Sequence, residues 1–354
     1  MIETEVIRVD PEWPDPEVMR RAGELIRAGE LVAFPTETVY GLGGDALNPG
    51  ASEKIYAAKR RPSDNPLIVH IADMEHLDRI IRELPPEGEK LARAFWPGPL
   101  TMIFHKTDAV PLTTSGGLET VAVRMPVHRV AAELIRASGG YIAAPSANAS
   151  GRPSPTSAGH VFEDMNGRIP LILDGGPSGI GLESTIVDLT EDVPVILRPG
   201  FITQDMLSEA VGEVRLDPGL MDAAASQGVR PKAPGMRYRH YAPRAPLFIV
   251  EGAEREVTEH IRRLAEEAAA SGKCVGIIAS DSSAQSYLGT GAIIRDIGDR
   301  SMDETIARHL FAVLRDFDRE QVDVIYSESF ATPHLGMAIM NRLLKAAGHQ
   351  VISV

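Results

Sequence analysis

The stretch Leu31–Ala46, LVAFPTETVYGLGGDA, constrains the fold of this chain more than any other segment. Its apolar start, Leu31 to Phe34, has the length and composition of a short buried strand, and Pro35 ends the strand because proline cannot donate to a sheet ladder. Hydroxyl groups, a carboxylate and glycines follow at once: Thr36, Glu37, Thr38, Tyr40, Gly41, Gly43 and Gly44. We expect these glycines to allow close backbone approach or positive φ. A strand that runs into such a turn is typical of ligand sites in α/β proteins, although an ordinary strand-exit turn also fits.

The bulk composition limits what kind of protein this chain is. At 354 residues it exceeds an average domain, so we expect two domains, and its hydrophobic content of 44% suffices for packed cores. The formal net charge of −13 argues against bulk electrostatic binding to nucleic acid or to an anionic membrane. Any anionic ligand must therefore be held by a local group of cationic side chains.

Cysteine usage and missing motifs exclude several kinds of site. Cys274 is the only cysteine, which excludes an intramolecular disulfide and a cysteine-rich zinc site and fits a reducing cytoplasm. We see neither a secretory signal nor a run of about 18 apolar residues that predicts a membrane span. The patterns GxxxxGK(S/T), GxSxG, HExxH and CxxC are missing, and the C-terminal half has no GxGxxG. We expect no P-loop, no bound zinc and no dinucleotide cofactor.

The pattern along residues 1–211 predicts a mixed α/β domain. Residues 15–29 form a helix that Asp15 caps and Gly29 ends. Further helices are expected near 51–60, 87–95, 128–138 and 203–211, and strands at 31–34, 67–71, 100–104, 120–125, 141–144, 171–173, 184–189 and 195–198.

A linker and a second, smaller domain are expected to follow. Residues 212–245 lack a hydrophobic period, and basic side chains gather in their second half: Arg230, Lys232, Arg237, Arg239, His240 and Arg244. In residues 246–354 we expect strands at 247–250, 273–279 and 322–326, helices at 254–270 and 335–347, and a further helix that Ser301 and Glu304 begin as a capping box. This pattern fits a small open parallel sheet with helices on its faces.

Three cationic side chains, Lys59, Arg60 and Arg61, close the predicted helix 51–60. They fit charge complementation at a helix C-terminus. They also fit an anion site, because the rigid polar loop 62–66 follows directly. The sequence leaves both explanations open.

A buried arginine is expected on the strand 120–125, where the period of two places Arg124 on one face with Thr120. Burying an unpaired arginine is costly, so Arg124 needs a carboxylate from the protein or from a ligand. His70 lies on the strand 67–71, and a lone strand histidine is more often structural than functional.

The segment 143–156, AAPSANASGRPSPT, places many short hydrogen-bonding side chains directly after a strand: Ser146, Asn148, Ser150, Ser154 and Thr156. Such groups suit phosphate or sugar recognition, although a structural loop is the alternative. Ser184 begins another strand, and Arg198 ends the last strand of this domain. With cations and hydroxyls but no nucleophile–base pair, the site has the profile of phosphate-ester chemistry that depends on positioning and electrostatics.

Taken together, FPTETVYGLG, KRRPSDNPLIVHI, WPGPLT, TVAVRMP, APSANASGRPSPT, STIVDL and ILRPG resemble the YrdC-type domain. The PGMRYRHYAP linker and the second α/β domain resemble the long form of the threonylcarbamoyl-AMP synthase family. The resemblance implies a YrdC-like twisted mixed sheet with helices (1–211), a linker and active-site lid (212–245) and a Rossmann-like parallel α/β domain (246–354). It implies synthesis of threonylcarbamoyl-AMP and pyrophosphate from L-threonine, bicarbonate or CO2, and ATP with Mg2+. The product would pass to a separate complex that modifies tRNAs reading ANN codons.

The resemblance also implies roles for individual residues. Contacts to L-threonine fall on Thr38, His70, Arg124, the backbone of Ala144, and Ser184. Contacts to ATP fall on Arg61, Asn65, Thr120, Ser146, Ser154, Arg198 and a linker residue, Arg237 or Tyr238. Lys59, Arg61 and Arg198 would balance the charge that moves onto pyrophosphate, with no metal ligand supplied by the chain.

Three other functions stay open at this point. A double-stranded RNA-binding module is one, and the acidic net charge speaks against more than weak RNA binding. The second is a carbamoyl transferase with another acceptor, as in hydrogenase maturation, although a single cysteine excludes the zinc fingers of those proteins. The third is a regulatory protein that binds nucleotide through its second domain.

Overall fold

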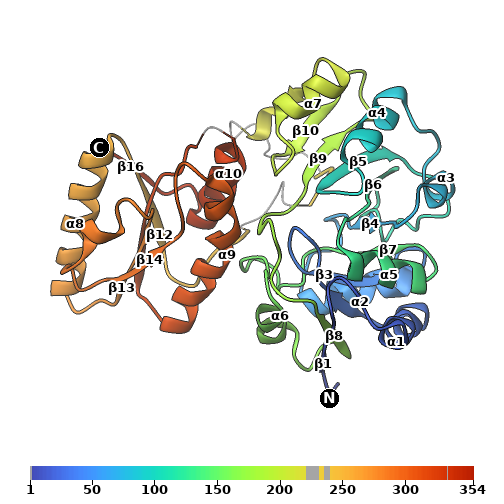
Figure 1. The fold of residues 1–354 in the computed structure, drawn as a ribbon, viewed down its shortest axis with the longest axis horizontal. Coiled ribbons are helices and arrows are strands. Elements are labelled where there is room, and N and C mark those ends of the chain that lie inside the picture. The colour runs from blue at the N-terminus through green and yellow to red at the C-terminus, as the bar shows by residue number, and fades with distance from the viewer. Residues whose placement is uncertain (1, 221–230, 235–239, 333) are drawn as a thin grey trace. The chain divides into compact units, whose positions relative to one another are not determined.

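The computed structural model describes residues 2–220, 231–234, 240–332 and 334–354. Within these residues the chain forms two compact units, each of which Figure 1 shows with its own sheet. The N-terminal unit comprises Met1–Ser150, Ser154–Gly179 and Glu183–Tyr238, and the C-terminal unit comprises Arg239–Val354 with Gly151–Pro153 and Ile180–Leu182. Four basic or tyrosine positions of the expected linker lie outside the described residues: Arg230, Arg237, Tyr238 and Arg239.

One mixed sheet of eleven strands forms the centre of the N-terminal unit, in the order β1-β8-β2-β3-β7-β4-β6-β5-β9-β10-β11 (Figure 1). Its strands are β1 (Glu5–Arg8), β2 (Val32–Phe34), β3 (Gly41–Asp45), β4 (Ile68–His70), β5 (Leu100–His105), β6 (Thr120–Arg124), β7 (Ile142–Ala143), β8 (Leu171–Asp174), β9 (Thr185–Asp188), β10 (Val195–Arg198) and β11 (Arg215–Leu216). Parallel and antiparallel pairs both occur, for example β4 with β6 and β5 with β6. The predicted mixed sheet is confirmed.

Helices cover this sheet on both faces. They are α1 (Pro16–Arg27), α2 (Pro49–Lys59), α3 (Leu77–Ile80), α4 (Pro86–Phe95), α5 (Arg129–Ala137), α6 (Ala158–Met165) and α7 (Gln204–Val211), with short 3-10 turns at Met74–His76 and Pro218–Leu220. Asp15 caps α1 as predicted, because its side chain accepts from the backbone N–H of Glu17.

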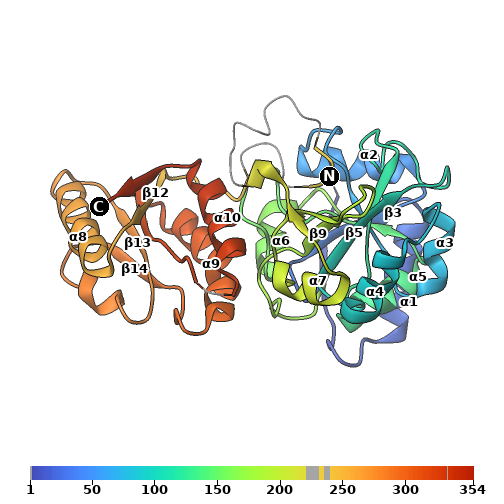
Figure 2. The same cartoon turned by 90° about the horizontal axis from the view of Figure 1, so that it is seen from above.

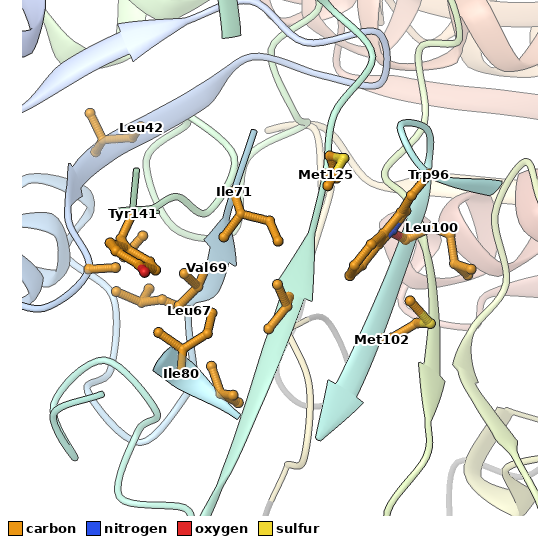
Figure 3. Close-up of a cluster of buried hydrophobic side chains, with 14 of the residues drawn as sticks. Leu42, Leu67, Val69, Ile71, Ile80, Trp96, Leu100, Met102, Met125 and Tyr141 are labelled. Atoms are coloured by element: carbon orange, nitrogen blue, oxygen red, sulfur yellow. The ribbon is translucent and has the colours of Figure 1, made fainter. Parts of the chain in front are cut away.

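Apolar side chains of each face make a separate core. On one face, α1 and α5 pack against β2, β7 and β8 through residues such as Ile26, Leu134 and Phe34. On the other face, a larger core contains Val69, Met102 and Trp96 together with side chains of α2, α4, α6 and α7 (Figure 3). Alternation along β2, for example, places Val32 and Phe34 in the first core and Ala33 in the second.

A row of registered residues crosses the face that α1 and α5 share. Ile142 on β7 pairs with His70 on β4, His70 with Arg124 on β6, and Arg124 with Thr101 on β5. Thr101 in turn pairs with Ile186 on β9, which pairs with Arg198 on β10. Registered partners point to the same face, so polar side chains from distant parts of the sequence gather beyond the end of the apolar core.

The C-terminal unit contains a parallel sheet in the order β14-β13-β15-β12-β16. Its elements are β12 (Leu247–Glu251), α8 (Glu254–Ala270), β13 (Val275–Ala279), β14 (Ile293–Asp296), α9 (Asp303–Glu320), β15 (Val324–Glu328), α10 (Gly336–Ala347) and β16 (Val351–Ser353), with a 3-10 turn at Ala284–Tyr287. Figures 1 and 2 show α8 on one face of this sheet and α9 and α10 on the other. The expected Rossmann-like parallel α/β architecture is confirmed. None of the helices in the described ranges is long and apolar enough to cross a membrane.

The glycines after Tyr40 lie in a strand, which the sequence analysis did not predict. β3 runs antiparallel to β2, with Gly41 opposite Phe34 and Gly43 opposite Val32. A Cβ on Gly43 would lie 2.9 Å from side-chain atoms of Phe34 and of Ile142. Of the two roles expected for these glycines, close approach is therefore the one that the structure shows.

The predicted capping box at Ser301 and Glu304 is wrong. The helix α9 begins at Asp303, its N-cap is Met302, and no side chain caps it. The Ser301 hydroxyl donates instead to the Asp299 carboxylate at 2.8 Å, in a turn that precedes the helix. A local side-chain turn has replaced the cap, which is the usual competition for serine near a helix start.

Candidate active site

Arg124 is the centre of the polar row, at the end of β6. Its side chain is buried, and its guanidinium donates to Glu37 Oε1 at 2.6 Å and to Thr38 Oγ1 at 2.7 Å. A longer bond of 3.4 Å joins Nε to the carbonyl of Gly98. The protein therefore supplies the carboxylate that a buried arginine needs, from the turn after β2. Two of the five guanidinium N–H groups make no hydrogen bond within the described residues, so Arg124 can still bind a ligand carboxylate.

The hydroxyls of Thr36 and Thr38 form a directed chain with Arg124. Thr36 Oγ1 donates to the carbonyl of Val39 at 2.6 Å, so at its 2.8 Å contact with Thr38 it can only accept. The hydroxyl proton of Thr38 must therefore point toward Thr36, while its oxygen accepts from Arg124. In this arrangement Thr38 offers a ligand only an acceptor, which suits an ammonium or hydroxyl group better than a carboxylate.

His70 lies beside Arg124 in the sheet register and is almost fully buried. Burial and, less strongly, the Arg124 charge lower the pKa of His70 to about 3, so the imidazole is neutral at physiological pH. Nδ1 lies 3.2 Å from the carbonyl of Ile68, which can only accept, so Nδ1 carries the proton. Nε2 is then an acceptor, like the oxygen of Thr38.

This depressed pKa predicts a pH-dependent stability. The unfolded chain protonates His70 below about pH 6.5 whereas the folded chain does not, so stability rises with pH between about 3 and 6.5 and is lost as pH falls. His70 contributes up to about 1.4 kcal/mol per pH unit to the slope of the unfolding free energy against pH in this window. Glutamine does not titrate, so we expect His70→Gln to remove this contribution. Urea unfolding of both proteins at pH 7, 6 and 5 checks this, and equal slopes would contradict it.

Ser184 and Arg198 form a second polar group with Thr101 on the same face. Arg198 donates through Nε to the Ser184 carbonyl at 3.0 Å and through a terminal N–H to the Ser184 hydroxyl at 3.2 Å. The Ser184 hydroxyl also lies 2.7 Å from that of Thr101, and all three side chains are buried. The structure thus brings Ser184 and Arg198 together, as a site built from both requires.

Lys59 ends α2 inside the protein rather than at its surface. Only 1% of the residue is exposed, and its ammonium donates to the backbone carbonyls of Ser146 and Asn148, the latter at 2.5 Å. The Ser146 hydroxyl in turn donates to the Asn148 side chain. Lys59 therefore fixes the shape of the loop that follows β7.

The remaining predicted ATP contacts lie in loops and at one strand start. Arg61 donates to the carbonyls of Asn65 and Pro66, and the buried Oδ1 of Asn65 makes no hydrogen bond within the described residues. Ser154 donates to Glu183 at 2.5 Å. Thr120 begins β6, four residues from Arg124 and on the same face, which places it about 13 Å away.

Ala144 and the linker complete the set of predicted positions. The Ala144 N–H donates to the carbonyl of Ile68 at 2.9 Å, which holds the backbone after β7 against β4. Ala233 is fully buried and packs on the same sheet face with Ile68, Ala122 and Ile186, and the adjacent Pro234 carbonyl accepts from Arg198. The two alternatives for a linker contact to ATP, Arg237 and Tyr238, both lie outside the described residues.

A large mixed sheet and a smaller parallel sheet, in this order, define a YrdC-like domain followed by a Rossmann-like domain. Two family models match the chain: one described as "Telomere recombination" over residues 24–200, and one described as "Threonylcarbamoyl-AMP synthase, C-terminal domain" over residues 202–348. The threonylcarbamoyl-AMP synthase of Pyrococcus abyssi is 49% identical and the match covers 97% of this chain and 96% of that protein. The Bacillus subtilis threonylcarbamoyl-AMP synthase is also 49% identical, with coverage of 96% and 95%.

A solved structure agrees with these matches. The crystal structure of P. abyssi Sua5 complexed with L-threonine has a TM-score of 0.92 and 47% identity, and the match covers 99% of both chains. The chain belongs to the threonylcarbamoyl-AMP synthase family, in its long form with two domains, and is a nucleotidyltransferase.

Three residues that the structure joins to this site were not among the predicted site residues. Glu37 was noted but given no role, although it pairs with Arg124. Thr101 lies between Arg124 and Ser184, and only the antiparallel register of β5 with β6 places it there. Glu183 accepts from Ser154, and its position directly before Ser184 was the available signal.

Proposed function

We propose that this chain makes threonylcarbamoyl-AMP and pyrophosphate from L-threonine, bicarbonate or CO2, and ATP as its magnesium complex. The names of its relatives and the L-threonine complex of P. abyssi Sua5 support this reaction. The single observation that carries the proposal is the buried Arg124, which keeps two N–H groups for a carboxylate while acceptors surround it.

An amino acid matches this group of side chains in charge and in hydrogen bonding. Its carboxylate would bind Arg124, and its ammonium and hydroxyl groups are donors for the acceptors at Thr38 and His70. Ser184, which directly precedes β9 and already accepts from Arg198, would also contact the threonine. A simple anion would use only Arg124 and would leave the acceptors unpaired.

The ATP part of the site is supported by two loops with buried polar groups. Lys59 shapes the loop of Ser146 and Asn148. The Oδ1 of Asn65, which no donor in the described part of the chain reaches, is an acceptor for a group such as an adenine amine. The metal would arrive with the nucleotide phosphates, because the described parts of the chain contain no group of three or more histidine, cysteine or acidic residues that could hold an ion.

The chemistry proceeds in two balanced steps. The threonine ammonium first releases a proton to solvent, and the resulting neutral amine attacks CO2, forms a new N–C bond and releases a second proton to solvent, which gives an N-carboxylate. This carboxylate attacks the α-phosphorus of ATP, and the bond to the β,γ-phosphate breaks as pyrophosphate leaves. Arg61 and Arg198 would stabilise the charge that moves onto pyrophosphate, by positioning and electrostatics rather than by covalent catalysis.

The linker would act as a lid over the site. Burial of Ala233 on the sheet face beside the site supports a covering role for its neighbours. A lid would exclude water and protect a labile adenylate.

The product would serve tRNA modification in the cytoplasm. It would pass to the complex that forms N6-threonylcarbamoyladenosine in tRNAs reading ANN codons.

Pyrophosphate release tests the proposed function directly. The full chain is incubated with ATP and Mg2+, and L-threonine and bicarbonate are each omitted in turn. We expect release to need both and to be weak with serine or valine. Release without threonine would replace the proposal with an ATP pyrophosphatase activity, and no release in any mixture would overturn the proposed reaction.

A further inference from the structure

Glu37 has one carboxylate oxygen whose hydrogen bonding is incomplete. Its side chain is 12% exposed, and Oε1 pairs with Arg124 at 2.6 Å. Oε2 is buried and has no hydrogen-bond partner among the described residues. A buried carboxylate oxygen without a donor is destabilising, and such an atom calls for a specific explanation, of which a bound group that supplies the donor is one.

Thr38, His70 and Arg124 do not supply that donor. The proton of Thr38 points to Thr36, so Thr38 has only its oxygen to offer. His70 is neutral, with its proton directed at the carbonyl of Ile68, which leaves Nε2 as an acceptor. The remaining N–H groups of Arg124 are the donors needed by a substrate carboxylate. A ligand that completes the hydrogen bonding of Oε2 brings a donor of its own, and a cationic donor makes the strongest hydrogen bond with a carboxylate.

We propose that Glu37 binds the ammonium group of the amino-acid substrate through Oε2, and that this contact makes the site select amino acids over hydroxy acids. The inference rests on the proposed function and names a specificity residue for that same site. The Arg124–Glu37 pair is neutral as a unit. A zwitterion with its carboxylate at Arg124 and its ammonium at Glu37 completes an alternating array of four charges, in which each neighbouring pair attracts.

A structural role for Glu37 makes a different prediction from a binding role. If Glu37 only holds Arg124 in place, its loss weakens every ligand that carries a carboxylate, whatever the group at the α-carbon. If Glu37 binds the ammonium, its loss weakens only ligands that carry this group. The α-hydroxy analogue of threonine, (2S,3R)-2,3-dihydroxybutanoate, separates the two roles because it keeps the carboxylate and the side chain.

Isothermal titration calorimetry of the full chain with both ligands is the test. Glu37→Gln keeps an oxygen to accept from Arg124 but removes the charge. We expect it to weaken L-threonine by about 10- to 150-fold, the range for a charge-assisted hydrogen bond, and to change the hydroxy acid by less than about threefold. The matched control Glu89→Gln, on the exposed surface of α4 and paired with Arg93, is expected to bind both ligands like the wild type.

Each outcome decides a different claim. Parallel weakening of both ligands, or of neither, overturns the ammonium contact while the proposed function stands. Failure of the wild-type protein to bind L-threonine removes the proposed function, and the inference falls with it. If circular dichroism shows that Glu37→Gln does not fold, Glu37→Asp is titrated instead. Aspartate keeps the charge, but its side chain is one methylene shorter, so the carboxylate lies farther from the ligand. A loss with L-threonine that exceeds the loss with the hydroxy acid at least about fivefold supports the contact, and a smaller difference overturns it.

Discussion

Replacing Arg124 with alanine is expected to raise the L-threonine concentration needed for half-maximal pyrophosphate release by about 150-fold or more. A charge-assisted hydrogen bond contributes about 1.5–3 kcal/mol, which is about 10- to 150-fold in affinity. The variant also leaves the Glu37 carboxylate without its counter-charge. That carboxylate would then repel the substrate carboxylate, so we place the loss at the upper end. The ATP requirement should change far less, and steady-state kinetics with each substrate varied separately measures both.

The same variant is also expected to lose stability, which requires a control. Breaking a buried ion pair by removing one partner costs about 3–5 kcal/mol, because the other charge stays buried. The double variant Arg124→Ala with Glu37→Gln also removes the unpaired carboxylate charge. We expect its free energy of unfolding to lie above that of Arg124→Ala. The L-threonine concentration that it needs for half-maximal activity should stay high. Arg93→Ala, on the exposed surface of α4, is the matched control for the loss of an arginine from an ion pair. A folded Arg124→Ala protein that needs the same L-threonine concentration as the wild type for half-maximal pyrophosphate release would contradict the role of Arg124.

The elements that the sequence predicted well are those with strong periodicity or clear end signals. Asp15 and Pro16 fix the start of α1, and the apolar stripes of α8 and α10 lie within the predicted ranges. β1 and β14 were missed because each is a four-residue strand without strict alternation. β3 was missed because three of its five residues are glycine, which is depleted in strands. The Phe34 ring lies against Gly41 and Gly43, whereas a Cβ on Gly44 would meet side chains of Leu31, Ala51 and Ile55.

The candidate site was predictable where a residue type was unusual for its element. A buried arginine on a strand required a carboxylate from the protein or from a ligand, and in the structure the protein supplies it through Glu37. The sequence did not identify Glu37 as that partner, because the contact joins residues 87 positions apart. The place of Thr101 in the site could not be predicted for a related reason. A threonine in a strand is ordinary, and only the strand order places it between Arg124 and Ser184. Long-range pairing of this kind depends on sheet register, which a single sequence does not determine.

Lys59→Met is expected to lower kcat/KM for ATP by about 100-fold and to leave L-threonine binding nearly unchanged. Methionine has a similar length but donates nothing, so it removes two charge-assisted bonds to the carbonyls of Ser146 and Asn148. The loop of Ser146 and Asn148 then loses the two bonds that join it to the end of α2. Lys54→Met is a matched control on the same helix, because Lys54 is exposed and pairs with Glu30.

Nucleotide binding separates two explanations of that loss. If Lys59 acts by shaping the loop of Ser146 and Asn148, its removal should weaken AMP and a non-hydrolysable ATP analogue by similar factors. If its ammonium contacts the β- and γ-phosphates instead, only the ATP analogue should weaken, because AMP lacks those groups. The buried position of Lys59 and its carbonyl partners favour the parallel loss. Equilibrium titration of both nucleotides against wild type, Lys59→Met and Lys54→Met measures it. A loss confined to the ATP analogue would make Lys59 a direct phosphate ligand and contradict a purely positioning role.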